Sequence, residues 1–147
     1  MPSTHLSLHY HIIFSTKGRR RMIADTWRDN LHVYIGGIIG DMNAVPTAIG
    51  GSGDHTHVLV GLRATHVLAD VVRQMKRGAS EWIHSHGVKA FTWQEGYAAF
   101  TVSPSQVAKV TQYIANQLEH HRRRSFEDEY LALLRSSGVD FDERYLW

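Results

Sequence analysis

Two histidine pairs have the spacing expected of metal ligands on a β-strand. His55 and His57 form one pair, and His9 and His11 form the other. Because side chains alternate along a strand, the imidazoles of a pair share one face with Cα atoms ~6.6 Å apart, close enough to hold one ion. The spacing alone leaves a second interpretation equally open, namely two polar residues on a solvated sheet face. The chain has no cysteine and eleven histidines, so imidazoles must carry any transition-metal site.

A tyrosine and a glutamine further along the chain could add a nucleophile and an oxygen ligand. Tyr113 and Gln117 are four residues apart, so a helix places them on one side, and His120 and Arg124 continue that stripe. A phenol is a weak nucleophile until a cation or base favours the phenolate. A glutamine oxygen suits Mg²⁺ and Mn²⁺, and imidazole ligands favour Mn²⁺ of the two. The competing interpretation is an amphipathic helix with a solvated polar face.

Basic residues gather in three short segments. Each alone is typical of a solvated surface, but together with Trp93, Tyr97 and Phe100 they could follow a phosphate backbone and stack bases. The net charge of only +2 does not by itself predict nucleic-acid binding. The candidate DNA-binding residues are Lys17, Arg19, Arg20, Arg21, Arg73, Lys76, Arg77, Arg122 and Arg124.

The elements that must position these residues follow a β-α-β-β-α-β order. The hydrophobic pattern predicts strands over 6–14, 44–50, 55–62 and 97–102, and helices over 25–39 and 67–84. This order is the split βαβ arrangement of an α+β, ferredoxin-like domain. We expect an antiparallel sheet with the first and third strands in the middle, both helices on one face, and Pro46 in an edge strand. The other face, with the histidine pairs, is expected to be open.

Two further helices are expected after the last strand. Residues 103–106 (Ser-Pro-Ser-Gln) match a capping box with proline at the first helical position, and they predict a helix from 103 to about 123. Residues 125–128 begin a short helix that extends to about Leu134. The tail 139–147 is aromatic, and we expect it to pack on the rest of the chain.

The chain length corresponds to about one domain, because domains average ~150 residues. We expect a single domain over 1–147, divided into a core (1–102), a tyrosine-bearing helix (103–124) and a C-terminal helix and tail (125–147). No apolar run approaches the ~18 residues of a membrane span, and no secretory signal is visible. The expectation is therefore a soluble, cytoplasmic protein without membrane association.

The chain resembles the single-tyrosine HUH transposases of small insertion sequences, a family that includes REP-associated relatives. The resemblance rests on residues 53–60 (Gly-Asp-His-Thr-His-Val-Leu-Val) and 113–117 (Tyr-Ile-Ala-Asn-Gln), with flanking matches at 10–17 and 93–97. HUH denotes two histidines around a bulky hydrophobic residue. Thr56 departs from that pattern, whereas the pair on the first strand fits its letters better. The Gly-Asp turn before the third strand still favours the later pair as the family's metal ligands.

The resemblance implies an enzyme that cleaves and rejoins single-stranded DNA. His55, His57 and Gln117 would hold one Mg²⁺ or Mn²⁺ ion, which would polarise the scissile phosphodiester. Tyr113 would attack the phosphorus and form a 5′-phosphotyrosine with a free 3′-hydroxyl, and rejoining would need no nucleotide cofactor. The family recognises imperfect hairpins at element ends and acts as a homodimer, in which the tyrosine helix can complete the partner's site.

Three other functions fit parts of the sequence. A non-catalytic single-stranded nucleic-acid-binding module could share the fold, although such modules stack bases on sheet aromatics where this chain has histidines. A host-adopted relative that acts on chromosomal repeats would share the chemistry. A metal-dependent phosphodiesterase without a covalent step would need the metal but not the tyrosine.

Overall fold

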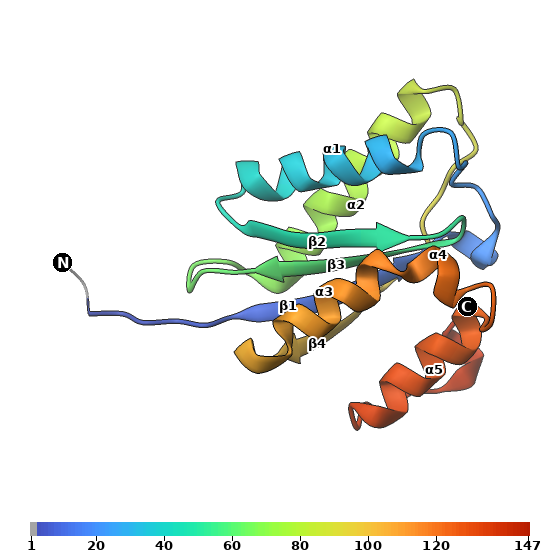
Figure 1. The fold of residues 1–147 in the computed structure, drawn as a ribbon. Coiled ribbons are helices and arrows are strands. Elements are labelled where there is room, and N and C mark those ends of the chain that lie inside the picture. Colours follow the sequence, from blue (N-terminus) through green and yellow to red (C-terminus); the bar gives the residue numbers. More distant parts are fainter. Residues whose placement is uncertain (1–2) are drawn as a thin grey trace.

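The computed structural model describes residues 3–147, and its centre is a four-stranded antiparallel sheet (Figure 1). The strands are β1 (His9–Ser15), β2 (Val45–Gly51), β3 (His55–Gly61) and β4 (Ala98–Val102), in the order β2-β3-β1-β4. The expected ferredoxin-like α+β fold is confirmed, with the first and third strands in the middle. β2, which contains Pro46, is an edge strand as expected, because its proline nitrogen cannot donate to a further strand.

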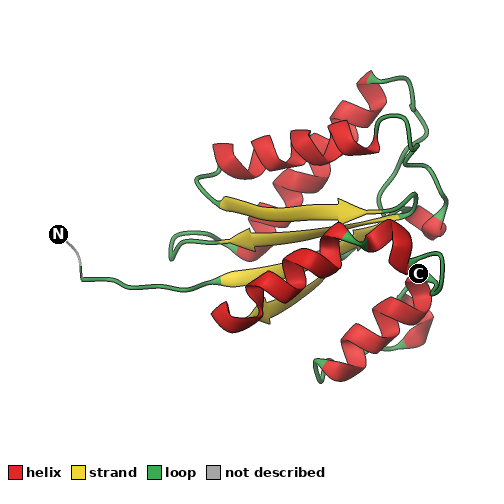
Figure 2. Cartoon of the chain, viewed as in Figure 1, coloured by secondary structure: helices red, strands yellow, loops and turns green. Residues whose placement is uncertain are grey.

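Two helices cover one face of the sheet, as Figure 2 shows. They are α1 (Arg28–Asp41) and α2 (Leu68–Ser85), and they pack against each other as well as on the strands. The main core lies in this layer, where Ile12 and Val58 from the two central strands meet Leu31 and Met75 from the helices, all fully buried. This layer holds the central strands in place by hydrophobic burial.

The opposite face of the sheet is covered, so the expectation of an open face is wrong. α3 (Val107–Ala115) and α4 (Gln117–His120) cross it, and α5 (Phe126–Ser136) lies beside them (Figure 1). A second apolar cluster explains the cover, because Ile13 and Ala98 on this face pack with Phe126 and Leu134 of α5. Three short 3₁₀ helices complete the chain at Lys17–Arg19, Pro104–Gln106 and Glu143–Tyr145.

The tyrosine-bearing helix is shorter than expected and is broken. Pro104–Gln106 forms a 3₁₀ turn, and the side chain of Ser103 makes no capping hydrogen bond, so the predicted capping box is absent. α3 ends at Ala115, and Asn116 has non-helical dihedrals (φ −97°, ψ 17°) before α4 begins. Asparagine favours helix ends because its side chain competes for backbone hydrogen bonds. The break turns Gln117 inward, where it is buried.

The two ends of the chain differ in their packing. β1 begins at His9 rather than at Leu6, because its partners run out there: His9 is opposite both Gly61 and Val102. Residues 3–8 extend away from the sheet (Figure 1). At the other end, the tail packs on α5 as expected, with Trp147 against the ring of Phe126. Within residues 3–147, no helix is both long enough and apolar enough to cross a membrane.

Candidate active site

A tight turn brings His55 and His57 into β3 with their imidazoles on the covered face. A Cβ on Gly51 would lie 2.2 Å from the carbonyl oxygen of His55, so only glycine allows the turn to close this tightly. The turn ends at Asp54, whose carboxylate lies 2.7 Å from Nδ1 of His55 and also accepts a hydrogen bond from Ser52. This contact fixes the ring with Nδ1 protonated and Nε2 directed into the protein.

Four side chains converge on one point beneath α4. Each of these residues offers one possible ligand atom, and the four atoms lie within 4.8 Å of one another. The residues are His55, His57, His121 and Glu129. Oε1 of Glu129 is 2.9 Å from Nε2 of His57 and 3.4 Å from Nε2 of His121. Three imidazoles and a carboxylate are a donor set that suits a first-row divalent ion.

Gln117 belongs to the same cluster. Its Oε1 lies 3.0 Å from Nε2 of His55 and 2.9 Å from Nε2 of His121. His55 donates from Nδ1 to Asp54, and Nδ1 of His121 is 2.8 Å from the carbonyl oxygen of Arg124. When these rings are neutral, both Nε2 lone pairs therefore face a carbonyl oxygen. Lone pairs that converge in this way repel unless a proton or a cation lies between them, so the donor set fits a bound cation.

The rival histidine pair does not form a second cluster. Nε2 of His11 lies 2.7 Å from Nδ1 of His57, so His11 supports that ring from behind. His9 is at the far end of β1, opposite Gly61, and its Nδ1 is buried without a hydrogen-bond partner among the described residues. His11 can therefore set the tautomer of His57, while His9 lies outside the site.

Tyr113 lies at the edge of the cluster. Its hydroxyl donates a hydrogen bond to Oε2 of Glu129, the carboxylate that also contacts His57. Its ring centroid is 5.7 Å from that of His57 and 5.4 Å from that of His120. The phenol and the candidate metal ligands are thus brought together by one carboxylate.

Burial and hydrogen bonding set the charges of this cluster. Burial lowers the pKa of His57 to about 4, although the hydrogen bond to Glu129 opposes that shift. Burial also lowers the pKa of His11 to about 3, with the neighbouring His57 as a further cause. Burial raises the pKa of Glu129, but hydrogen bonds from His121, His57 and Tyr113 outweigh burial and bring it below its usual value. For His57 and His11 these shifts favour a neutral imidazole near an ionised carboxylate, the protonation states in which such residues bind metals. Burial lowers the pKa of His121, but its hydrogen bond to Glu129 and the charge of Glu129 together outweigh burial and raise that pKa, so a metal bound there would displace a proton.

The pKa of Tyr113 shifts in the direction that opposes ionisation. Burial of the phenol and its hydrogen bond to the Glu129 carboxylate both raise its pKa above the usual value. In the metal-free protein Tyr113 is therefore a neutral phenol at physiological pH. Its use as a nucleophile requires a cation close enough to offset the Glu129 charge.

Sequence reasoning missed Glu129 and His121. The sequence does contain a pattern that indicates Glu129. It lies on the apolar face of α5 with Phe126 and Leu133, where a carboxylate is unusual. Glu129 is 1% exposed, and a buried carboxylate almost always has partners. His121 follows His120 immediately after α4, and only the break at Asn116 determines that His121 turns toward the cluster.

The basic residues predicted to bind DNA lie in several places. Arg124 borders the cluster through Tyr113, and Arg122 pairs with Glu119 at 3.1 Å on the surface. Arg19 pairs with Glu127 and lies over the ring of Trp147, 4.3 Å from its centroid. Arg21 lies against Gly53 in the turn before His55 and acts on the charge of Asp54. The remaining residues are Lys17 and Arg20, near the end of β1, and Arg73, Lys76 and Arg77, on α2.

Lys76 and Trp93 do not fit the expectation of an exposed basic surface with aromatic side chains that stack on bases. Lys76 donates hydrogen bonds to the carbonyl oxygens of Gln94 and Gly96, so its ammonium group has protein partners. Trp93 is 8% exposed and packs against Phe14 in the core, so the expectation that it stacks on bases is wrong. Tyr97 is exposed beside α2 and remains available.

Comparisons with known proteins agree on one family. The family model described as "Transposase IS200 like" matches residues 4–117. A crystal structure of a transposase candidate from Deinococcus radiodurans R1 is 27% identical, with a TM-score of 0.66, over 80% of this chain and 95% of that chain. A REP-associated tyrosine transposase bound to a REP hairpin has a TM-score of 0.61 at 16% identity, over 82% of this chain and 73% of that chain. No curated protein sequence matches the chain.

Proposed function

The chain belongs to the family of IS200-like transposases, and we propose that it cleaves and rejoins single-stranded DNA through a phosphotyrosine. The observation that carries the proposal is the Tyr113 hydroxyl, which shares the carboxylate of Glu129 with the metal-binding histidines. A nucleophile and a metal site at this distance can act on the same phosphate.

We assign the metal ligands to His55, His57 and Glu129, with Gln117 and His121 as further donors. The support is the convergence of these atoms within the buried cluster. A bound Mg²⁺ or Mn²⁺ would supply Lewis acidity to the scissile phosphate, and the imidazole content favours Mn²⁺. Asp54 and His11 orient the two β3 histidines from behind, as outer partners of ligating imidazoles do.

Tyr113 then carries the covalent step. Its oxygen forms a bond to phosphorus, and the bond from phosphorus to the 3′-oxygen breaks. The phenol loses its proton and the 3′-oxygen gains one, so a 5′-phosphotyrosine and a 3′-hydroxyl result without any further reagent. In the structure the Tyr113 hydroxyl donates to Glu129, so that hydrogen bond is lost when the phenol gives up its proton.

The proposed substrate is single-stranded DNA with a hairpin. The similar REP-associated transposase is bound to a REP hairpin, which supports this substrate but says nothing of the sequence recognised here. The expected homodimer and the alternative of a host-adopted enzyme on chromosomal repeats stay proposals. A non-catalytic module that stacks bases on an open sheet is disfavoured, because α3, α4 and α5 cover that face.

The test is a covalent-adduct assay. The protein is mixed with labelled single-stranded hairpin oligonucleotides and Mn²⁺ or Mg²⁺, and adducts are separated on a denaturing gel. We expect an adduct that needs the ion, and Tyr113→Phe should abolish it while DNA binding persists. Tyr97→Phe is the control, since that tyrosine is exposed and outside the cluster. An adduct of undiminished yield from Tyr113→Phe would refute the proposal.

A further inference from the structure

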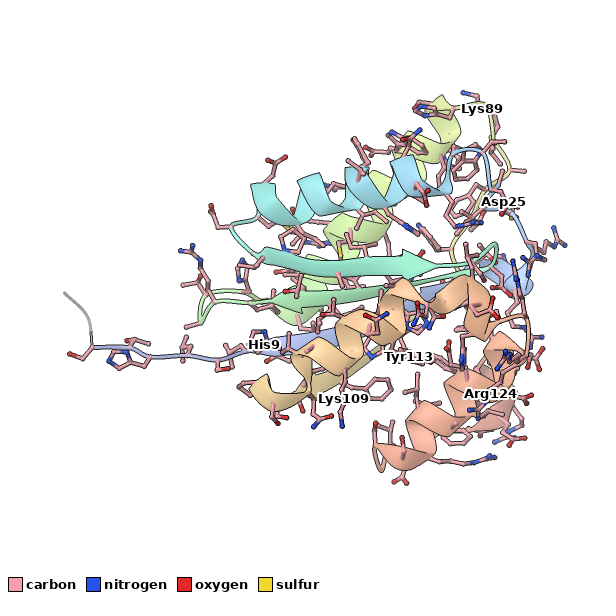
Figure 3. The ribbon with its side chains drawn as sticks, viewed as in Figure 1. His9, Asp25, Lys89, Lys109, Tyr113 and Arg124 are labelled. Carbon is pink, nitrogen blue, oxygen red and sulfur yellow. The ribbon has the colours of Figure 1, made fainter. Side chains whose placement is uncertain are left out.

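A groove of about 840 Å³ opens directly beside Tyr113 on the outer side of α3 and α4. Its volume is in the range of functional ligand sites. Its walls carry Lys109, Gln112, Asn116 and Arg124, and of these only Arg124 was a DNA-binding candidate from the sequence. Figure 3 labels Lys109, Tyr113 and Arg124, which follow one another from the start of α3 toward α5.

The polar groups of this groove match a single nucleic-acid strand. Lys109, Gln112 and Asn116 are exposed, and within residues 3–147 their side chains make no hydrogen bond or ion pair. Lys109 and Arg124 are cations suited to phosphate, and the two amides can hydrogen-bond base edges. The one acid in the wall, Glu119, is already neutralised by Arg122 at 3.1 Å and Arg123 at 3.9 Å.

The polar side chains of the groove are arranged in a line along the helix. Lys109, Gln112 and Asn116 are separated by three and four residues, so they form one stripe with Tyr113 between the last two. From Lys109 to Asn116 the stripe is about 10 Å long, at about 1.5 Å per residue. A strand that meets the phenol can therefore continue along the stripe past more than one nucleotide.

We infer that this groove binds the DNA strand that stays attached to Tyr113, namely the strand on the 5′-phosphate side of the break. The inference rests on the proposed function, because that function determines which end of the broken strand is attached to Tyr113. In an in-line displacement the leaving oxygen lies opposite the nucleophile, so the 3′-hydroxyl end departs on the side away from Tyr113. The 5′-linked strand stays bonded to the phenol through the phosphorus, and the groove begins beside that phenol.

The test uses short probes that need no cleavage site. Fluorescent dT octamers with either a 5′-phosphate or a 3′-phosphate are titrated with the protein, and binding is measured by anisotropy at several salt concentrations. The 5′-phosphorylated probe should bind more tightly, and Lys109→Glu should weaken it roughly tenfold and lower its salt dependence. Lys89→Glu is the matched control, because Lys89 is exposed in the turn that follows α2 (Figure 3).

The outcomes separate this inference from the proposed function. If Lys109→Glu binds both probes as Lys89→Glu does, or if the two probes bind equally, the groove assignment is wrong, even when the wild-type protein forms the Tyr113 adduct. If the 5′-phosphate preference depends on Lys109 but no adduct forms with any hairpin, the groove stands and the strand-transfer proposal fails. Gln112→Ala combined with Asn116→Ala should change which base is preferred at the 5′ position, measured with dA, dC and dT probes.

Discussion

At the scale of single residues, the most informative side chain is Glu129. It is a carboxylate from the C-terminal helix, yet it contacts His57, His121 and the hydroxyl of Tyr113. A buried charge in a protein this small is costly unless it is paired or bound to a metal. Its position explains how an all-histidine cluster gains the negative charge that a divalent ion requires.

The first prediction concerns that charge. Glu129→Ala and Glu129→Gln should each weaken Mn²⁺ binding at least tenfold, because an anionic ligand is lost from the cluster. Isothermal titration calorimetry with MnCl₂ measures the affinity directly and does not depend on DNA. Asp128→Ala is the control, since Asp128 is exposed on the same helix. Unchanged Mn²⁺ affinity in both Glu129 variants would remove this residue from the ligand set.

The second prediction concerns Thr56, the residue between the two histidines. Thr56 is fully buried, and its hydroxyl has no hydrogen-bond partner among residues 3–147. Thr56→Val removes this unsatisfied group and should stabilise the fold by about 1 kcal/mol, or about 2–4 °C in Tm. Thermal unfolding followed by circular dichroism measures the change. The exposed Thr101→Val on β4 should have almost no effect, and a destabilised Thr56→Val would mean that the hydroxyl has a partner in solution.

At the scale of elements, the site depends on how closely α3 approaches the sheet. A Cβ on Gly50 would lie 2.3 Å from the carbonyl oxygen of Ile114. Gly50 is also the β2 residue opposite His57 in the register. The position of the tyrosine helix is therefore set directly beside the histidines, and a shift of α3 must move both Tyr113 and Gln117.

The third prediction follows from this contact. Gly50→Ala should push α3 away from β2 and destabilise the fold by about 1–3 kcal/mol, and it should also weaken Mn²⁺ binding because Gln117 moves. Urea unfolding and MnCl₂ titration measure the two effects. Gly37→Ala is the matched control: nothing lies within 4 Å of its added Cβ, and alanine is favoured by about 0.5–1 kcal/mol inside a helix. If Gly50→Ala is as stable as Gly37→Ala, the close approach does not hold α3.

At the scale of the whole molecule, one chain supplies every residue of the proposed site. Tyr113 and Glu129 come from the C-terminal elements, and His55 and His57 come from the sheet, all within the same chain. The resemblance left open whether the tyrosine helix completes its own site or a partner's. In this single chain, α3 contacts its own β2, which corresponds to the first arrangement.

The fourth prediction tests that arrangement. A mixture of Tyr113→Phe with His57→Ala should form no covalent adduct on the hairpin that labels wild-type protein, because neither chain has both the nucleophile and the complete metal site. Sedimentation velocity of the same mixture establishes whether the chains associate. An adduct from the mixture, carried by the His57→Ala chain, would show that the tyrosine acts on a partner's site.

The sequence alone predicted the order of the strands and helices, the middle position of β1 and β3, the edge strand at Pro46, and His55, His57, Tyr113 and Gln117 as the candidate site. The order of the elements depends on local periodicity and turn chemistry, which adjacent residues determine, and the central strands follow from the split βαβ arrangement. Spacing made the four site residues candidates, and the resemblance to a known family selected them. The broken tyrosine helix, the covered sheet face and the inward positions of Glu129 and His121 depended on the tertiary structure. They arise from contacts between residues far apart in the chain, such as the 72 positions between His57 and Glu129, and no pattern within either segment determines where they meet.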